Sequence, residues 1–404
     1  MRAACWTILA ASLCAANLAR ADDFTWAGYI DGRLIAPPHE VSWLKGGLGK
    51  LRFGSPDGSV DLRFADAIAD LGWHATPELS LTTSLRIEPD QRTGVDALEA
   101  YASYRPHADG AWRWSLKTGA FFPPLSLENN DIGWSSVYTL TPSAINSWVG
   151  DELRTIGAEG AIARRTQIGT VTLLGALYTR NDPAGVLIAE RGWTLDDRPT
   201  GLFETVHEPN ASLEHMRRAA PDRTPLFLEI DGRPGWYAGG AWDLPGVGHA
   251  QFLYYDNDAM PTAHESDYFT WHTQFWSEGV RSNIGDATIL FQNIAGSTTV
   301  EFRAPSTWTT NFWSSYALAS YDLGDWRLSL RGDLFGTAQD AAFWNSFGEH
   351  GRAVTASVAW APLDWLKLTA ELIALDATRL ERVAEGLAKE EVDDQFQLSA
   401  RVSF

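Results

Sequence analysis

Cysteine is nearly absent from this 404-residue sequence, which contains only Cys5 and Cys14. Both lie within residues 1–21, which we expect to be removed. The remaining chain, residues 22–404, has no thiol for a disulfide, an Fe–S cluster or a cysteine nucleophile. A large secreted chain without disulfides must gain its stability from extensive strand pairing or burial, and a closed barrel supplies the pairing.

The N-terminus has the pattern of a secretory signal peptide. A short positive start is followed by small and apolar residues, and residues 19–21 (Ala-Arg-Ala) form a small-x-small cleavage site. We therefore expect cleavage after Ala21. A lipidated Cys14 is the alternative, but Leu13 stands where such a site usually has a small residue.

Long hydrophobic runs are absent as well. After residue 21 no apolar run reaches the length of about 18 residues that a membrane-spanning helix needs. Strands of an outer-membrane barrel do not need such a run, because they alternate apolar residues toward lipid with polar residues toward the lumen. The sequence therefore predicts no transmembrane helix and leaves a membrane barrel open.

Positive charge is scarce: 32 Lys and Arg stand against 51 Asp and Glu, for a net charge of −19. Nucleic acid is not expected as a partner, because phosphate binding needs clustered basic residues. The excess of acidic residues has two equally good interpretations. It fits a surface that faces water and divalent ions, and it also fits a protein whose net charge keeps it soluble.

Catalytic and metal-binding motifs are also missing. The sequence has neither the G-x-S-x-G elbow of serine hydrolases nor the H-E-x-x-H of zinc enzymes. His207-Glu208 and Glu214-His215 lie in one long connection without the spacing of metal ligands. We expect them to be solvated, and we expect no metal and no cofactor.

What is present is a two-residue alternation. At the C-terminus Phe396, Leu398, Ala400, Val402 and Phe404 occupy every second position, with polar residues between them. A period of two places the two sets on opposite faces of a strand. The terminal Phe on such a strand resembles the targeting signal read by the outer-membrane assembly machinery; a soluble β-domain that ends in Phe is the alternative. The same alternation recurs at 79–87, 112–120, 170–177, 326–334, 354–360 and 366–372.

Short and long connections alternate along the chain. Short ones rich in Pro, Gly and Asp, typical of tight hairpins, are predicted at 75–78, 106–110, 164–168, 244–248, 278–285, 323–325 and 361–364. Long ones are predicted at 37–58, 89–94, 122–150, 181–234, 257–266, 296–310, 337–350 and 376–391. Seven short turns and eight long loops require sixteen strands. We therefore expect one domain, residues 22–404: an all-β, antiparallel transmembrane barrel of about sixteen strands, with short periplasmic turns and long outer loops.

Tryptophan is abundant, with 19 residues, and many stand near expected strand ends. Tryptophan collects at the boundary between lipid and water, so these positions predict aromatic girdles. Core packing in a soluble β-protein is the alternative, but it does not account for the clustering beside turns. The residues are Trp26, Trp73, Trp112, Trp236, Trp242, Trp326, Trp360 and Trp365.

One stretch resembles a known family. Residues 119–128 read G-A-F-F-P-P-L-S-L-E, similar to the G-x-F-x-P-P-x-S-L-E stretch of the phosphate- and polyphosphate-selective porins. The resemblance implies that the loop at 122–150, entered through Pro123 and Pro124, folds inward and narrows the pore. An external loop with a rigid entry is the alternative. The resemblance also implies a homotrimer, which the residues themselves do not indicate.

The chain departs from that family where anions would be selected. Anion selection needs Arg or Lys at the constriction, but residues 122–150 contain neither. They contain Glu128 and Asp131 instead. We therefore do not expect the phosphate selectivity of the family.

Charged side chains fall on the expected lumen faces of several strands. Opposed charges across a narrow pore would screen solutes; the alternative is that they only hydrate the lumen and pair with one another. The candidate pore-lining residues are Arg63, Arg86, Arg113, Lys117, Arg327, Arg331, Asp333, Lys367 and Glu371, with Glu88, Glu99, Arg105 and Arg401 on the same side.

These observations predict an outer-membrane porin that lets small hydrophilic solutes or ions diffuse through a water-filled lumen, with lipid and lipopolysaccharide around it. The alternatives are an outer-membrane enzyme of the lipase or esterase type and a non-conducting barrel with a filled lumen. The long loop at 181–234, with a short helix expected at 210–220, would plug the mouth, cover it or contact a neighbouring subunit.

Overall fold

Sixteen antiparallel strands close into a barrel in the computed structural model, which describes residues 23–108, 110–208, 223–303, 306–341 and 348–404. The predicted fold class and strand number are confirmed. The barrel strands are β1 (Phe24–Ala36), β2 (Asp61–His74), β3 (Leu79–Ile87), β4 (Asp96–Tyr104), β5 (Trp112–Phe121), β8 (Thr155–Thr166), β9 (Gly169–Thr179), β12 (Gly235–Leu244), β13 (Gly248–Asp256), β16 (His272–Ile284), β17 (Ala287–Arg303), β18 (Ser306–Leu323), β19 (Trp326–Ala341), β20 (Gly348–Leu363), β21 (Leu366–Arg379) and β22 (Glu390–Ser403).

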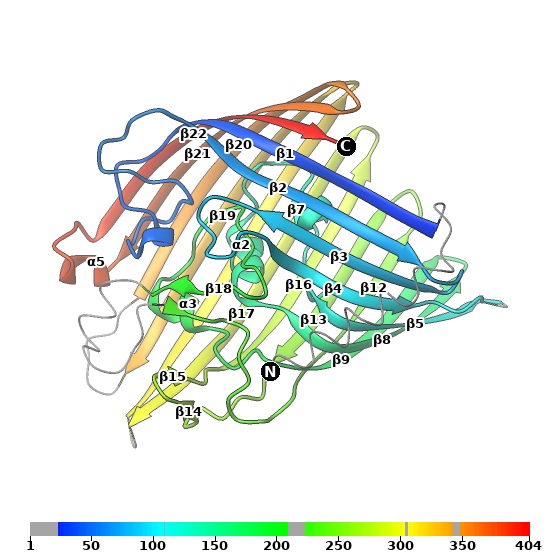
Figure 1. The fold of residues 1–404 in the computed structure, drawn as a ribbon, viewed down its shortest axis with the longest axis horizontal. Helices are drawn as coiled ribbons and strands as arrows, with labels where there is room; N and C mark the ends of the chain where they lie inside the picture. Colours follow the sequence, from blue (N-terminus) through cyan, green and yellow to red (C-terminus); the bar gives the residue numbers. More distant parts are fainter. Residues whose placement is uncertain (1–22, 109, 209–222, 304–305, 342–347) are drawn as a thin grey trace.

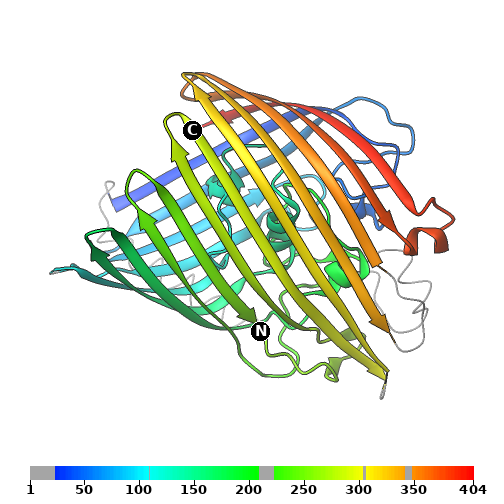
Figure 2. The same ribbon diagram turned by 180° about the vertical axis from the view of Figure 1, so that it is seen from behind.

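The first and last strands close the cylinder. β1 pairs with β22 from Tyr29–Ser403 to Ala36–Phe396, so each of the sixteen described barrel strands has a paired strand on both sides. The terminal Phe404 lies over Gly28, where any side chain at position 28 would meet its ring. Figures 1 and 2 show the barrel, with its tilted strands, from two opposite sides.

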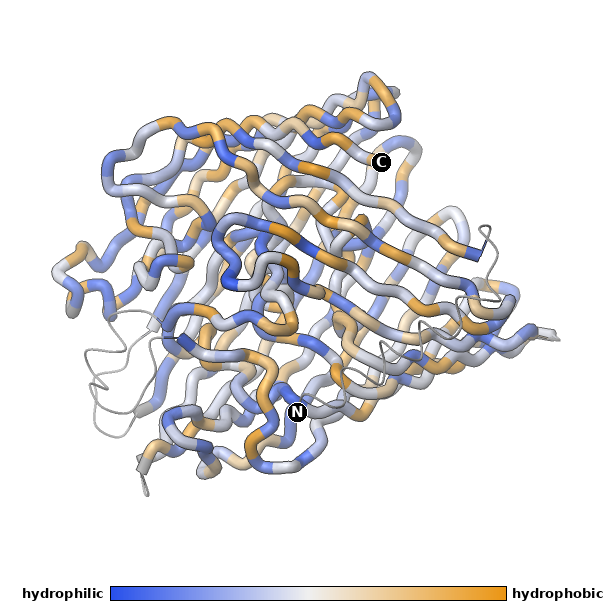
Figure 3. The backbone as a smooth tube through the Cα atoms, viewed as in Figure 1, coloured by the Kyte–Doolittle hydropathy of each residue, from blue (hydrophilic) through white to orange (hydrophobic). Residues whose placement is uncertain are grey.

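The two-residue alternation sorts side chains between the two faces of the wall. On β22, Phe396, Leu398 and Val402 are exposed on the outer face, whereas Gln397 and Ser399 are buried on the inner face. Figure 3 shows the same alternation of hydrophobic and hydrophilic residues along the strands. An apolar exterior and an enclosed, largely polar interior are the arrangement that a barrel surrounded by lipid requires.

Short turns lie at one end of the barrel, called the turn end here, and longer loops at the other, called the loop end. The connections at the loop end are numbered as outer loops 1 to 8 in chain order. The smaller elements in these loops are η2 (Trp43–Lys45), β6 (Asn129–Asp131), η3 (Ile132–Trp134), β7 (Ser135–Ser136), α2 (Ala144–Glu152), α3 (Val186–Glu190), β10 (Val206–His207), β11 (Arg223–Thr224), β14 (His264–Glu265), β15 (Tyr268–Phe269) and α5 (Glu381–Ala384).

Several predicted boundaries are wrong, and the largest differences lie in the second half of the barrel. The turn expected at 278–285 begins only after Ile284, and the loop expected at 296–310 is mostly strand, because β17 reaches Arg303 and β18 starts at Ser306. The loops expected at 337–350 and 376–391 are shortened in the same way. Ser, Thr and Asn on both faces of these strand ends hide the alternation, although the backbone pairing continues.

Most of the expected girdle tryptophans are exposed on the outer face. Trp26 is 66 % exposed and Trp112 55 %, and Trp326 stacks on Trp360 across paired strands, with ring centroids 5.3 Å apart. Trp73 is half-buried beside Phe24.

Two predicted features lie outside the described residues: the signal peptide, residues 1–21, and the short helix at 210–220. Among the residues that the structure describes, no helix is long and apolar enough to cross a membrane.

Candidate functional site

The third outer loop, residues 122–154, fills the middle of the barrel. In both ribbon views its helix α2 lies between the front and back walls (Figures 1 and 2). Ser143 caps the helix: its hydroxyl accepts the backbone N–H of Asn146 at 3.3 Å. Every residue of α2 is buried. Ile145, Trp148 and Val149 belong to one apolar cluster with inward residues of the wall.

Polar contacts hold this loop against strands β19 to β21. Arg331 donates to the carbonyl oxygens of Thr141 at 2.7 Å and Pro142 at 2.9 Å. The carboxylate of Glu371 accepts the backbone N–H of Leu140 at 2.6 Å and that of Thr141 at 3.0 Å. The predicted lumen residues Arg331 and Glu371 therefore bind the loop and do not face open water.

Two further predicted acids serve the same loop. Asp333 pairs with Arg331 at 2.7 Å and accepts the N–H of Ala144 at 3.2 Å, beside the start of α2. Glu128 accepts from the N–H of Ser143 and from the amide of Asn146, each at 2.7 Å. Both carboxylates are buried and hydrogen-bonded to the loop, so they fix the position of the start of α2.

The other predicted residues of this loop, Pro123, Pro124 and Asp131, differ in their exposure. Pro123 is buried at the entry, whereas Pro124 and Asp131 are exposed. Asp131 caps η3, and its carboxylate accepts the N–H of Ile132 at 2.9 Å. Phe122, next to the prolines, stacks on Trp134 at a centroid distance of 4.2 Å and so folds the loop onto itself.

A segment of the fourth outer loop crosses the lumen as a strap, defined here as residues 193–204. Asp197 bridges two elements: its carboxylate lies 2.5 Å from Arg33 on β1 and 2.9 Å from Arg52 in the first outer loop. Burial alone would raise the pKa of Asp197, but the two guanidiniums outweigh burial and hold it well below its ordinary value.

The strap makes a second set of ion pairs near the end of β3. Arg198 pairs with Glu88 and with Glu204, and Arg52 also reaches Glu88 at 3.0 Å. The predicted residue Arg86 lies in this network, 3.4 Å from Glu204. All of these side chains are buried. The network ties the first loop, the strap and the barrel wall into one ionic cluster.

The wall opposite this cluster is apolar, which differs from the expectation of polar inward residues. Tyr178, Tyr255 and Phe275 point inward and stack in a row, with centroid distances of 5.3 and 4.7 Å. They belong to the same buried cluster as Trp148 and Trp193. Packing against loops rather than contact with water explains why this wall departs from the polar pattern.

Glu152 at the end of α2 connects the two loops. Its carboxylate accepts the N–H of Leu187 in α3 at 2.8 Å and the indole N–H of Trp148. Burial raises the pKa of Glu152 to about 7, against the lowering effect of these hydrogen bonds and of Arg191.

One small cavity and one wider hollow lie on the inner side of the barrel wall. A cavity of about 20 Å³ lies between the β1–β2 wall and the loops, lined in part by Tyr29, Trp134, Asp197 and Arg401. A volume of this size holds about one water molecule. At the turn end a wider hollow of about 490 Å³ is lined in part by Glu78, Arg105, His107 and Arg113.

Basic residues at the turn end are less tightly held than those beside the loops. The guanidiniums of Arg105 and Arg113 are exposed, and no carboxylate among the described residues pairs with either. The ammonium of Lys117 lies 4.9 Å from the ring centre of Tyr101 and 4.5 Å from that of Phe121. Arg105 and Arg113 line the wider hollow, whereas Lys117 is not among its lining residues.

The remaining predicted residues lie near the rims. Arg63 pairs with Asp61 at 2.8 Å at the loop end of β2. Arg327 pairs with Asp322 at 2.6 Å at the turn end and donates to the carbonyl oxygen of Val137. Lys367 is half-buried on β21, opposite Arg401 on β22.

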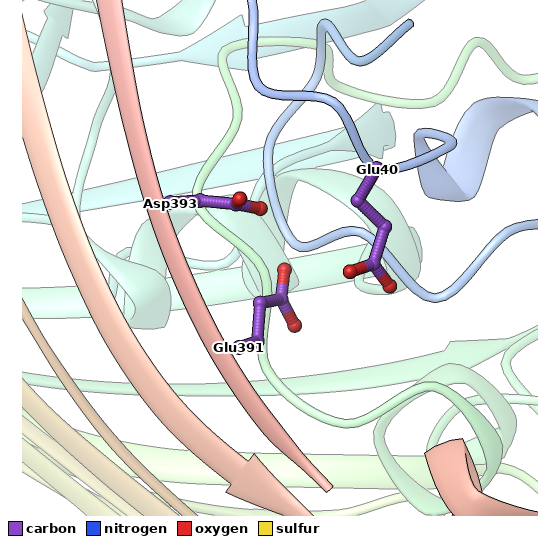
Figure 4. A group of neighbouring side chains, drawn as sticks. All are labelled: Glu40, Glu391 and Asp393. Carbon is purple, nitrogen blue, oxygen red and sulfur yellow. The ribbon is translucent and has the colours of Figure 1, made fainter. Parts of the chain in front are cut away.

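Three carboxylates meet where the first loop approaches β22 (Figure 4). One oxygen of each of Glu40, Glu391 and Asp393 lies within 4.8 Å of the others. Arg382 of the eighth loop donates to Glu40 at 2.5 Å and to Glu391 at 2.8 Å, and the backbone N–H of Lys50 donates to Glu391 at 3.1 Å. Arg382 supplies the counter-charge, so the group ties the first and eighth loops together.

The residues that close the lumen were largely missed in the sequence. Asp31 and Arg33 share one face of β1 and bond at 2.9 Å, and this i, i+2 charge pair is a signal that could have been found. Asp197 and Arg198 stand in a long connection without periodicity, where no local pattern indicates their contacts.

The chain is similar to known proteins in structure but not in sequence. No protein-family model matches the chain, and no curated protein matches it. The outer-membrane channel DcaP of Acinetobacter baumannii has a TM-score of 0.54 at 10% identity, over 96% of this chain and 99% of that one. An anion-selective porin from Comamonas acidovorans has a TM-score of 0.50 at 11% identity, over 94% and 99%.

The trimer form of in-vitro folded OmpT, an outer-membrane protein of Vibrio cholerae, has a TM-score of 0.50 at 12% identity, covering 94% of this chain and 99% of that one. At sequence identities this low, structural similarity indicates a shared fold but not a shared activity. The chain therefore has the sixteen-stranded barrel fold of outer-membrane porins.

Proposed function

We propose that the chain is an outer-membrane porin that lets small hydrophilic solutes or ions diffuse along its lumen. The observation that carries this proposal is the sorting of side chains around a closed cylinder, with apolar residues outside and charged residues inside. A closed barrel satisfies every strand backbone without water on its outer face, so it can stand in a bilayer. The turn end would face the periplasm and the loop end the outside.

In this proposal the third outer loop folds inward and sets the pore width. Support comes from its bonds to inward residues of the far wall, Arg331 and Glu371. The strap adds a second constriction through Asp197. Because the strap and the third loop are buried and ion-paired to the wall, we propose that conduction requires the strap to move, and we expect a small conductance in which closed intervals dominate.

We propose a preference for anions in the turn-end hollow. Arg105 and Arg113 have no carboxylate partner among the described residues, and their charges are therefore available to a passing solute. The anion-selective porin from Comamonas acidovorans shares the fold and gives a precedent for this preference. Glu128 does not oppose it, because this carboxylate is buried, hydrogen-bonded and 3.5 Å from Arg331.

The reversal potential under a salt gradient tests this assignment. Neutralising exposed Arg113 to Gln should move the reversal potential toward cation preference, because a free pore charge is lost. Neutralising Arg331 to Gln should instead loosen the third loop and raise conductance, because its charge is already bound. Conductance with a reversal potential that Arg113→Gln leaves unchanged would remove Arg113 from the selectivity mechanism.

A non-conducting barrel is the second candidate, and the buried apolar cluster shared by the loops and the wall favours it. In that case the loops would be a permanent plug, and the barrel would serve a structural or adhesive role. Flat bilayer traces both for the protein and for a variant with a released strap would support it. For a homotrimer, the support is the resemblance of residues 119–128 and the trimer form of the Vibrio cholerae protein.

A further inference from the structure

We propose that a sodium ion binds in the small cavity between the third outer loop and the strap, on oxygen atoms of Asn129, Asn146 and Asp196. These three residues line the cavity of about 20 Å³, together with Tyr29 and Arg401 among others. Asn129 and Asn146 belong to the third loop, and Asp196 belongs to the strap. The ion would hold the two loops together whether or not the barrel conducts, so the proposal goes beyond the proposed function and does not rest on it.

Each of the three side chains has one buried oxygen that accepts no hydrogen bond from a described residue. These atoms are Oδ1 of Asn129, Oδ1 of Asn146 and Oδ2 of Asp196. The three residues are 5 %, 0 % and 1 % exposed, in the same order. A buried oxygen without a donor is unfavourable, and native proteins leave few of them. Three such atoms on the lining of one cavity therefore indicate a bound group that carries positive charge.

The contacts of two of these side chains fix which atom is left without a partner. The amide nitrogen of Asn146 donates to Glu128 at 2.7 Å and to the hydroxyl of Ser143 at 3.1 Å, so a flipped amide would lose both bonds. The other carboxylate oxygen of Asp196 accepts the backbone N–H of Arg198 at 3.2 Å. The remaining oxygens of Asn146 and Asp196 are therefore free acceptors, as the ligands of a hard cation must be.

The charges around the cavity favour a cation over a neutral molecule. Asp197 and Arg401 also line the cavity, but each has a counter-charge: Asp197 lies 2.5 Å from Arg33, and Arg401 lies 3.4 Å from Asp31. Among the described residues, no Lys or Arg forms a salt bridge with Asp196, whose orphan oxygen is fully buried. The lining therefore carries one negative charge that the protein itself does not neutralise.

A second buried acid beside Asp196 increases the need for positive charge. Arg191 pairs with Asp151 at 2.8 Å, so one guanidinium stands beside two carboxylates. Burial, and then the charge of Asp151, raise the pKa of Asp196 to about 8. A carboxylate in this state binds a proton or another cation. One excess charge and room for about one water molecule fit a monovalent ion better than calcium, which takes about six to eight oxygen ligands.

Amide exchange in two salts tests the site on the folded, detergent-solubilised protein. Sodium chloride at about 300 mM is compared, at about pH 8, with the same concentration of N-methyl-D-glucamine chloride, whose organic cation is too large for the cavity. We expect exchange across residues 193–204 to be about ten-fold slower in sodium, the factor 1 + [Na⁺]/Kd for a Kd of about 30 mM. Equal exchange in the two salts would mean that the cavity holds only water or a proton, and it would overturn the proposal.

Substitutions in the cavity separate binding at this site from a general effect of salt. Asp196→Asn removes the charge, and its exchange should be equal in the two salts. Asn129→Asp keeps the shape and adds a carboxylate, so the difference between the salts should grow. Asp376→Asn, at an exposed pair with Arg352, is the matched control and should keep the wild-type difference.

Two results with these variants would overturn the proposal. A sodium effect that survives Asp196→Asn would place the ion elsewhere in the protein. A sodium effect that Asn129→Asp leaves unchanged or reduces would remove the third loop from the site, and this result remains decisive if Asp196→Asn does not fold.

Discussion

At the scale of single residues, Asp197 holds the strap against the barrel wall. It is the described acid that touches both β1, through Arg33, and the first outer loop, through Arg52. Buried ion pairs of this kind add little net stability when formed, but breaking one leaves charge without a partner inside the protein. The network therefore determines where the strap sits more than it stabilises the barrel.

Asp197→Asn should release the strap. The substitution keeps the side-chain shape but leaves Arg33 and Arg52 with one acid partner fewer, at a cost of about 3 kcal/mol to strap docking. We expect faster amide exchange across residues 193–204 and a larger conductance. Asp376→Asn, which breaks the exposed pair with Arg352, is the control and should change neither quantity, because exposed pairs contribute little. Equal exchange in both variants would contradict the role given to Asp197.

Glu152 gives the lumen a pH dependence. Its pKa is raised to about 7, so the packed loops bind its proton more tightly than a solvated glutamate, whose pKa is near 4.3, would. The stabilisation is therefore full at low pH and is lost as pH rises through about 7, by on the order of 3 kcal/mol. Conductance should rise between pH 5 and pH 8.

Glu152→Gln serves as the control for that pH effect, since glutamine cannot ionise. Its conductance should be flat over the same pH interval. A wild-type conductance that falls with pH, or a Gln variant with the same rise, would assign the effect to another group.

At the scale of elements, the position of the short helix α3 against the barrel wall depends on the backbone conformation of the glycine before it. Gly185 begins α3 with a φ of +102°, and a side chain there would meet the hydroxyls of Thr273 and Thr298 on the wall. Only glycine fits both the conformation and the close approach. The fourth loop is therefore seated at this glycine as well as through the ion pairs of the strap.

Gly185→Ala should loosen α3 at a cost of about 1–3 kcal/mol. Gly232→Ala separates backbone strain from the close approach to the wall. Gly232 also has a positive φ, of +77°, but no atom lies within 4 Å of the position that an added side chain would take. We expect faster amide exchange in residues 186–190 only for Gly185→Ala. If both variants behave alike, backbone strain and not the approach to the wall would be the reason.

The strands could be predicted because the alternation that indicates a strand lies within a short stretch of sequence. The contacts of the loops could not be predicted, because they join residues far apart in the sequence. Alternation at 396–404 or 366–372 determines which face meets lipid, and turn residues fix the count of sixteen. Asp197 meets Arg33 across 164 positions of chain, and no periodicity reports such a contact. Charged residues such as Arg331 were placed on the correct face, but their loop partners were not foreseen.

The extended ends of β17 and β18 were missed for a different reason. Thr299 and Thr309 bond to each other at 3.0 Å on paired strands that continue past the apolar belt. Beyond the belt the outer face has no lipid to meet, so polar residues stand on both faces and the alternation disappears. The alternation of apolar and polar residues therefore stops at the edge of the membrane, whereas the strands continue beyond it.

At the scale of the whole molecule, the closed wall and the loops inside it are held by different kinds of contact. The sixteen strands share backbone pairing all around the ring, while the loops are held by side-chain contacts that single substitutions can break. Such a division allows the filling to open locally without loss of the barrel. The proposed porin therefore depends on the strap and third loop moving within a wall that does not.

Planar-bilayer conductance of the purified barrel, measured beside its Asp197→Asn variant, tests this account most directly. The account predicts a small conductance with long closed intervals for the protein and a larger, more persistently open conductance for the variant. Flat traces from both, with each shown to be folded and inserted, would contradict it.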